Sequence, residues 1–518
     1  MTNLSDLIPA GGGQNNTDFV ADGTIASGKP VALTTAGKVK QVSSAAESPT
    51  IPYGTDNEWS TSANKSYGND MEFDPVTAGR VGVAYLNGSK YPSFFMGTRS
   101  GSTITWGSEV VLSSTVSNVG VSFCFDPNNA DKIMYLYYDS ATGIRVNVGT
   151  ISGSGVSITT SFGTAATLHA TTGYIDDKAI RPQCLIFDPS KTSTPTCLAL
   201  YWAQASSTLQ LAVATYSSTT ATAGSTLNLS SDLDLGPSGP NLDVNSAGTY
   251  GIACKNAGSS GYVGVLTAGI SGTTPSVSSI TNINSSDGGS GHLARFDPNN
   301  DNKFGVPYEV SSIGKVQIVT LSGSGHTATV TAGTETSFVS ENIYPDASIV
   351  FNPDSSNGEF IIGYQSDETA TAFDLVAVMG TYDDSDTNNT ITMGSSYLML
   401  DKSATDVPQS HFFNGCDGNV FGVNFVFDAD DDGQLLLGSM SGSNVSDLIG
   451  ISDAAISDTA SGNVTIKGGI AVNGLSSLTP GTDYYAQGDG TISTTSTSPA
   501  VKIGKALSAT SINLEYQS

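Results

Sequence analysis

One short pattern, Phe-Asp-Pro, returns along this chain at nearly constant spacing. Clear copies place the acid at Asp74, Asp126, Asp188 and Asp297, and a near copy carries Asn352 instead. A regular period of this kind indicates repeated supersecondary units rather than one large core. Two degenerate copies, NLDVN with Asp243 and HFFNG with Asn414, fill the gaps and give seven units spaced 52 to 62 residues apart.

Each unit continues in the same order after the turn. An apolar strand follows, such as RVGVAYL from Arg80 or KIMYLYY from Lys132, and then a polar hairpin. A third strand ends in a glycine-rich turn, such as GTISGSGVSIT from Gly149, and a fourth leads into the next unit. Four strands per unit in a regular array are typical of propeller blades. We therefore predict an all-β fold with a seven-bladed β-propeller over residues 51–445.

The repeated Phe-Asp-Pro is interpreted as a structural device. Proline ends a strand because it cannot donate to the ladder, and an aspartate can accept hydrogen bonds from backbone amides two residues on. The phenylalanine is expected to pack between adjacent blades. The alternative is a row of aspartates used for chemistry, which the two asparagine copies disfavour because asparagine keeps the cap but is no acid.

Composition restricts the partners. Lysine and arginine number 20 against 47 acids, for a formal net charge of −27, so the surface repels nucleic acid and anionic lipid. No apolar run is long enough to predict membrane insertion, and no secretory signal is expected at the N-terminus. The five cysteines are odd in number and form no CxxC pair, which favours buried free thiols over a disulfide framework.

The two ends of the chain read as parts of one small β-domain. Residues 22–50 contain SGKPVALTTAGKVKQV, and residues 446–518 contain LTPGTDYYAQGDGTISTT followed by VKIGKALSATSINL. These strings resemble a small β-domain that recurs in structural proteins of tailed bacteriophages, including tail fibres and other virion appendages. The resemblance implies that the propeller is inserted into a small β-sandwich or barrel-like domain formed by both ends. Residues 1–21 are expected to be a flexible arm.

The resemblance implies a non-enzymatic virion structural protein, as an appendage, fibre or head-decoration component. We expect it to bind other virion proteins through the arm and small domain, to form a homo-oligomer, and to display the propeller to a host-surface glycan or protein. No catalytic residue or cofactor comes with this family. The alternatives are a propeller glycan hydrolase or depolymerase on a tailspike, and a bacterial surface adhesin. Acids with raised pKa in the central channel would favour the enzyme, and an apolar plug the structural role.

One acidic segment is a candidate metal site. Asp428, Asp430 and Asp432, with Gly433, match Asp-x-Asp-x-Asp-Gly, the start of calcium-binding loops, in which alternate carboxylates converge on one calcium ion. Ser439 stands where an EF-hand loop would have glutamate, so the alternative is an acidic hairpin turn. The segment YDDSDTNN, from Tyr382, is a weaker version of the same pattern.

Other catalytic signatures are weak. The four histidines have no spacing typical of a zinc site. The five arginines are scattered, whereas a sialidase needs a cluster of them for a substrate carboxylate. The histidines are His169, His292, His326 and His411, and the arginines are Arg80, Arg99, Arg145, Arg181 and Arg295.

Overall fold

The structure, a computed structural model, divides the chain into two compact units. One consists of residues 48–440, and the other combines residues 1–47 with residues 441–518. These boundaries lie within five residues of those predicted from the sequence. The described residues are 15–34, 37–42, 57–61, 63, 69–117, 119–170, 180, 183–203, 208–229, 233–234, 241–256, 261–286, 293–311, 313–340, 343–355, 358–369, 372–384, 386, 388–400, 408–427, 432–440, 445, 448–487, 490–495 and 500–515.

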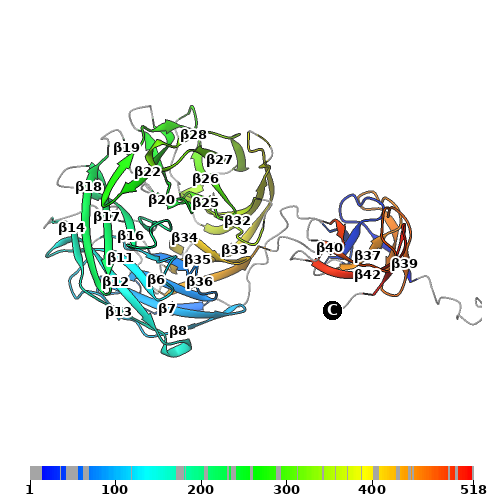
Figure 1. Cartoon of the computed structure of the whole chain (residues 1–518), viewed down its shortest axis with the longest axis horizontal. Helices are drawn as coiled ribbons and strands as arrows, with labels where there is room; N and C mark the ends of the chain where they lie inside the picture. Colours follow the sequence, from blue (N-terminus) through cyan, green and yellow to red (C-terminus); the bar gives the residue numbers. More distant parts are fainter. Residues whose placement is uncertain are drawn as a thin grey trace, which may run out of the picture. The chain divides into compact units, whose positions relative to one another are not determined.

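The larger unit is a β-propeller (Figure 1). Its described residues form seven antiparallel sheets of four to six strands, numbered here as blades 1 to 7 in chain order. The first strands of neighbouring blades lie beside one another, in the order β5, β10, β15, β20, β25, β30, β34 and back to β5. The innermost strand of each blade is a short sheet edge that faces the axis, where the ring protects it. The all-β propeller predicted from the repeats is confirmed.

The strands of each blade follow the order expected from the repeats, with short additional strands in some blades. Blade 1 holds β5 (Asp70–Phe73), β6 (Arg80–Leu86), β7 (Pro92–Ser100), β8 (Thr103–Trp106) and β9 (Val110–Val111); blade 2 holds β10 (Ser122–Phe125), β11 (Lys132–Asp139), β12 (Gly143–Ser152), β13 (Thr159–Phe162) and β14 (Ala166–His169); blade 3 holds β15 (Leu185–Phe187), β16 (Thr196–Ala203), β17 (Thr208–Ser217) and β18 (Thr220–Asn228); blade 4 holds β19 (Leu233–Asp234), β20 (Asn241–Val244), β21 (Tyr250–Asn256), β22 (Tyr262–Ser271), β23 (Thr274–Val277) and β24 (Thr281–Asn282).

The remaining blades complete the ring. Blade 5 holds β25 (Arg295–Asp297), β26 (Asn300–Val310), β27 (Ile313–Ser322), β28 (Thr329–Thr331) and β29 (Thr336–Val339); blade 6 holds β30 (Ile343–Phe351), β31 (Glu359–Thr369), β32 (Ala372–Tyr382) and β33 (Ile391–Leu400); blade 7 holds β34 (Pro408–Asp417), β35 (Val420–Phe427), β36 (Gly433–Ser439) and β4 (Asn57–Ser60).

Blade 7 is built from both ends of the unit. Its outer strand is β4, which comes before blade 1 in the chain and pairs antiparallel with β36. Arg99 of blade 1 adds an ion pair with Asp417 of blade 7, and Asp417 also accepts a hydrogen bond from the Gly79 amide at 2.8 Å. Opening the ring therefore requires breaking a strand ladder as well as side-chain contacts.

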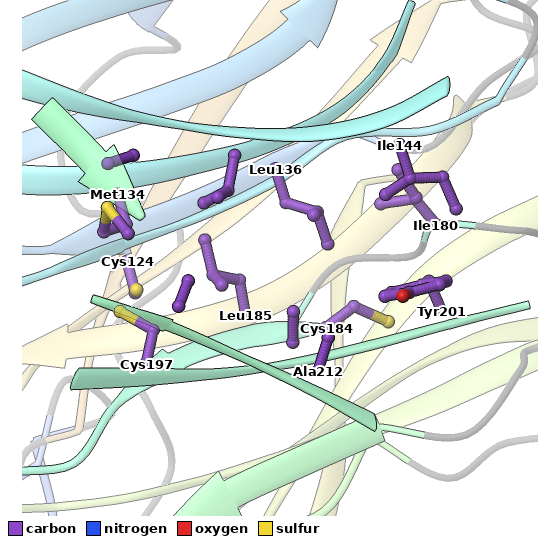
Figure 2. Packing of buried hydrophobic residues seen from close by; sticks show 14 of the residues in the cluster. Cys124, Met134, Leu136, Ile144, Ile180, Cys184, Leu185, Cys197, Tyr201 and Ala212 are labelled. Carbon is purple, nitrogen blue, oxygen red and sulfur yellow. The ribbon is translucent and has the colours of Figure 1, made fainter. Parts of the chain in front are cut away.

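Apolar packing between blades makes up the core. Each Phe of a Phe-Asp-Pro copy, such as Phe125 or Phe187, belongs to a cluster shared by its own blade and the preceding one, as predicted. Figure 2 shows the cluster between blades 2 and 3, where the side chains of Cys124 and Cys197 point toward one another. All five cysteines are free, and four are buried, as the sequence indicated.

The repeated aspartate caps the turn, as predicted. One carboxylate oxygen of Asp126 accepts the amide of Asn128 at 2.8 Å, and Asp297 does the same with Asn299 at 2.8 Å. The other oxygen of Asp297 accepts a hydrogen bond at 2.6 Å from the hydroxyl of Tyr382 in the next blade. The aspartate therefore closes its own turn and also connects two blades.

Two assignments within the repeat need correction. In blade 4 the turn is capped by Asn245, which accepts the amide of Ala247 at 3.1 Å, and Asp243 lies on the preceding strand β20. In blade 7 the strand β34 continues past Asn414 and turns after Asp417. The sequence motif is degenerate in both blades, and only the strand register identifies the equivalent position.

The smaller unit joins both chain ends in two five-stranded sheets that pack into one core. Ala32 and Ile451 of one sheet and Ile503 and Ile512 of the other belong to that core, which confirms the sandwich-like domain. The first sheet runs β1 (Asn16–Val20), β38 (Ser461–Ile466), β37 (Leu448–Ser452), β2 (Pro30–Leu33), β3 (Val39–Gln41), and the second β39 (Ile470–Ala471), β43 (Ser511–Leu514), β42 (Ala500–Ser508), β40 (Asp483–Gln487), β41 (Ile492–Ser493).

The segment that carries the phage resemblance lies in the second sheet. Tyr484 is buried and its hydroxyl accepts the amide of Thr479 at 2.9 Å, whereas Tyr485 is only partly buried. Pro480 and Gly481, with φ at 80° for the glycine, form the turn that this hydroxyl supports. One tyrosine faces the core and the other faces away, as the alternation of a strand requires.

The predicted flexible arm was too long. Residues 16–20 form β1, which pairs with β38 from Asn16 opposite Thr465 to Val20 opposite Ser461, and Ala21 is fully buried. These residues are ordered because their backbone groups complete the edge of a sheet. Residues 1–14 of the predicted arm lie outside the described residues. In the part of the chain that is described, no helix has the length and apolarity needed to cross a membrane.

Candidate functional site: the axial cavity

A cavity of about 700 Å³ lies at the centre of the ring, at the end where each first strand turns into the second. Its walls come from first strands and from the Phe-Asp-Pro turns of several blades. Pro75, Pro189, Pro298 and Pro353 of these turns all line it. The volume is within the range of about 300–1,000 Å³ typical of small-molecule sites. We name it the axial cavity.

Equivalent positions in the repeat differ sharply in chemistry at this level. The residue two places before the turn cap is charged in three blades: Glu72, Asp243 and Arg295. Strand register places Cys124, Ile186, Val350 and Gly415 at the same position in blades 2, 3, 6 and 7. The repeat accounts for the positions of the strands, but it does not account for charged side chains at this position in three blades.

The three exceptions meet at the axis. The Arg295 Nη2 lies 3.1 Å from Glu72 Oε1 of blade 1, and its Nη1 lies 3.8 Å from Asp243 Oδ1 of blade 4. The Gln183 side-chain amide, just before β15, also faces this guanidinium. In the amide orientation that satisfies both groups, its oxygen accepts hydrogen bonds from Arg295 at 2.8 and 2.9 Å. One arginine therefore connects blades 1, 4 and 5 with the segment that leads into blade 3.

Asp70 adds a further carboxylate beneath this arginine. It is fully buried, and its Oδ2 accepts hydrogen bonds from the Ser122 hydroxyl at 2.8 Å and the Phe123 amide at 3.1 Å. Asp243 makes the same kind of contact, since its Oδ2 accepts the Phe296 amide at 2.7 Å. Both acids join their blade to the next one. We call Asp70, Glu72, Asp243 and Arg295 the axial cluster.

Burial dominates the electrostatics of the axial cluster. It raises the pKa of Glu72 to about 8 and that of Asp70 to about 6, although Arg295 opposes both shifts. The pKa of Asp243 is raised for the same reason. Burial lowers the pKa of Arg295, but Glu72 and Asp243 outweigh it and keep the guanidinium charged. At neutral pH, Glu72 is therefore largely a protonated carboxyl group that can donate a hydrogen bond or a proton.

The proposed calcium ligands can be followed only in part. Asp428 and Asp430 lie outside the described residues, and Asp432 is half-buried just before β36. In the second acidic segment, Asp386 accepts the amide of Asn388 at 3.0 Å, and Asp384 pairs with Lys303 of blade 5 at 3.2 Å. That segment is thus a turn held by its neighbours. Across the described residues, no cluster of three His, Cys, Asp or Glu has the geometry of a metal site.

The arginines do not gather at one site. Arg80 pairs with Asp74 at 3.1 Å, and Arg145 donates to the Ala165 carbonyl at 3.2 Å in blade 2. Arg99 closes the ring, as described above, and Arg181 lies outside the described residues. Arg295 stands alone among the described arginines in the axial cluster. The sequence analysis treated Arg295 like the other arginines, although a charge at this position of the repeat, where other blades have apolar residues, was a usable signal.

Comparisons with known proteins identify only the kind of fold. No protein family and no curated protein matches the sequence. Similar solved structures include the BP39L lectin from Burkholderia pseudomallei, at 10% identity and a TM-score of 0.46 over 72% of this chain and 94% of the lectin. A PL25 ulvan lyase matches at 8% identity and 0.43 over 76% and 97%, and the NanB sialidase from Streptococcus pneumoniae at 12% and 0.37 over 77% and 71%.

The prediction of a non-enzymatic protein is therefore wrong as a deduction from the sequence. It rested on the lack of catalytic residues in the phage domain that the chain ends resemble. The centre of the propeller contains Glu72 and Asp243 with raised pKa, the pattern expected of an enzyme rather than of an apolar plug. Nothing in this fold excludes catalysis.

Proposed function

We propose that this chain is a surface component of a tailed-phage virion whose propeller binds host-surface glycan in the axial cavity. The observation that carries glycan binding is the cavity itself. It combines apolar rings, among them Phe73 and Pro298, with carboxyl groups that accept hydrogen bonds from hydroxyls. Apolar walls with a few polar groups suit a sugar, which has apolar ring faces and hydroxyl edges.

The virion assignment rests on the small unit. Its resemblance to phage appendage domains lies in the Leu478–Thr495 segment, which forms the ordered turn and strands described above. In this proposal the small unit and the N-terminal segment attach a homo-oligomer to other virion proteins, and the propeller faces the host. The formal net charge of −27 suits a protein that must not bind the packaged nucleic acid.

The test combines location with binding. An antibody raised against the purified chain should label phage particles at one regular position in electron micrographs. The purified full chain should bind host cells, and periodate oxidation of surface glycans should abolish that binding. Chain that is free in lysates but absent from particles would overturn the virion assignment, and periodate-resistant binding would overturn the glycan assignment.

A glycan hydrolase is the second candidate, favoured by the protonated carboxyl group of Glu72 inside the cavity. Glycosidases combine a protonated acid with an ionised carboxylate on either side of the scissile bond. Incubation of host polysaccharide with the full chain, followed by size-exclusion chromatography, tests this reading. Shortening of the polysaccharide that is lost in Glu72→Gln would support it, and unchanged length with the native chain would reject it.

A further inference from the structure

Acidic residues outnumber basic ones in the wall of the axial cavity. Among the described residues that line it, seven are acidic and one, Arg295, is basic. Arg80 and Arg99 stand nearby, but each is already paired, with Asp74 and Asp417 respectively. Even with those two cations counted, acids outnumber bases. The acids are Glu72, Asp74, Asp243, Asp297, Asp301, Asp354 and Asp417.

The guanidinium of Arg295 is also occupied. It donates to Glu72, lies 3.8 Å from Asp243 and donates to the Gln183 side chain. Its side chain is only 12% exposed. A ligand carboxylate would have to displace Glu72 from this arginine and would then face the remaining acids. Like charges at such distances repel, and a buried cavity screens the repulsion poorly.

The walls indicate how such a ligand would be held. Phe73, Phe296 and Phe351, with the turn prolines, provide apolar surface, and the aspartates stand at the turns above them. A sugar ring can pack on this surface while a cationic substituent reaches the carboxylates. We infer that the axial cavity selects glycans carrying a free amino group over glycans carrying a carboxylate. This inference rests on the glycan-binding function proposed above.

Three matched oligosaccharides test the selection. Tetramers of glucosamine, N-acetylglucosamine and galacturonic acid present an amine, a neutral amide and a carboxylate on rings of similar size. Calorimetric titration of the full chain at neutral pH should show the glucosamine tetramer binding at least about tenfold more tightly than the neutral tetramer, with the galacturonate tetramer weakest. Added salt should reduce the preference for the amine.

Variants locate the selection. Asp301→Asn should reduce the preference for the amine by about fivefold, because it removes one carboxylate from the cavity wall and keeps a side-chain acceptor for the Ser246 amide. Glu335→Gln is the matched control, since that glutamate pairs with Lys315 at 3.2 Å on the outer part of blade 5 and does not line the cavity. Equal losses in the two variants would show that the preference comes from net charge alone and would overturn the inference.

The remaining outcomes separate this inference from the proposed function. Binding of the galacturonate tetramer as tightly as the glucosamine tetramer would leave glycan binding intact and overturn the charge selection. Failure of all three tetramers to bind would overturn the inference. In that case periodate-sensitive binding to host cells would still preserve the proposed function, whereas loss of cell binding as well would remove both.

Discussion

Two charge clusters in this chain have opposite compositions and different surroundings. In the propeller, the axial cluster holds one arginine among three acids, and Glu72 is only 17% exposed. In the smaller unit, one acid stands between two lysines: Asp483 lies 3.0 Å from Lys502 and 2.9 Å from Lys505, with all three side chains 28–45% exposed. We call these three residues the surface cluster.

Their pKa values shift in opposite directions. Hydrogen bonds from Lys505 and Lys502 lower the pKa of Asp483, because water still solvates its charge and burial costs little. Burial raises the pKa of Glu72 to about 8 even though Arg295 touches it. An ion pair therefore does not decide the ionisation of a carboxyl group by itself. The cost of removing water from the charged carboxylate raises its pKa, and the attraction of a cationic partner lowers it. Inside the propeller the cost of losing water is the larger of the two.

The largest expected effect comes from removing the axial cation. Arg295→Met leaves three carboxyl groups around an apolar chain and should lower the free energy of unfolding by about 3–5 kcal/mol, as for other broken buried pairs. Denaturant unfolding of the full chain measures it. The loss should be smaller at low pH, where the acids bind protons. Arg145→Met, which removes a partly buried arginine from blade 2, is the control, and an equal loss there would show that the axial position is unexceptional.

A buried acid without a cation sharpens the comparison. Asp297 is satisfied by the Asn299 amide and the Tyr382 hydroxyl, so Asp297→Ala should cost about 1–3 kcal/mol by leaving both donors unpaired. Asp297→Asn keeps an acceptor for the amide and should cost clearly less. Urea denaturation of the two variants measures the difference. Identical losses would mean that volume, not hydrogen bonding, matters at this turn.

The pH dependence tests the axial cluster directly. The folded-state pKa of Glu72, about 8, lies above the ordinary value of 4.5 for a glutamate. Its contribution to stability is therefore complete below pH 4.5 and is lost as the pH rises through about 8. Asp70, raised to about 6, acts in the same direction. Thermal unfolding of the native chain from pH 4 to 9 should show the decline in stability, and Glu72→Gln should flatten it. A parallel decline in both proteins would contradict the assignment to Glu72.

The smallest effect is expected in the surface cluster. Asp483→Asn should leave the unfolding temperature of the small unit nearly unchanged, because exposed ion pairs contribute little to stability. Any difference that calorimetry detects at low salt should vanish at high salt. A large decrease in unfolding temperature that does not depend on salt would show that the surface cluster contributes to stability as the axial cluster does. The proposed difference between the two regions would then be wrong.

The architecture could be predicted from the amino-acid sequence alone. The spacing of Phe-Asp-Pro, the apolar strand after each copy and the glycine-rich turns depend on local backbone preferences, which are visible in a single chain. The pairing of the two chain ends followed from the segment around Tyr484. Where the motif degenerates, at Asp243 and Asn414, the equivalent turn residues could not be identified, because only the strand register shows that Asn245 and Asp417 replace them.

The candidate site became visible only when the folded blades were in place. Asp243 lies 171 residues after Glu72, and Arg295 lies 52 residues after Asp243, so the sequence does not show that the three side chains meet. Closure of the ring brings them within hydrogen-bonding or ion-pairing distance of one another through Arg295. Burial at the axis then sets their ionisation. Local sequence specifies the conformation of each strand, whereas long-range closure sets the distances between charges and their access to water, and these two quantities determine the chemistry of the cavity.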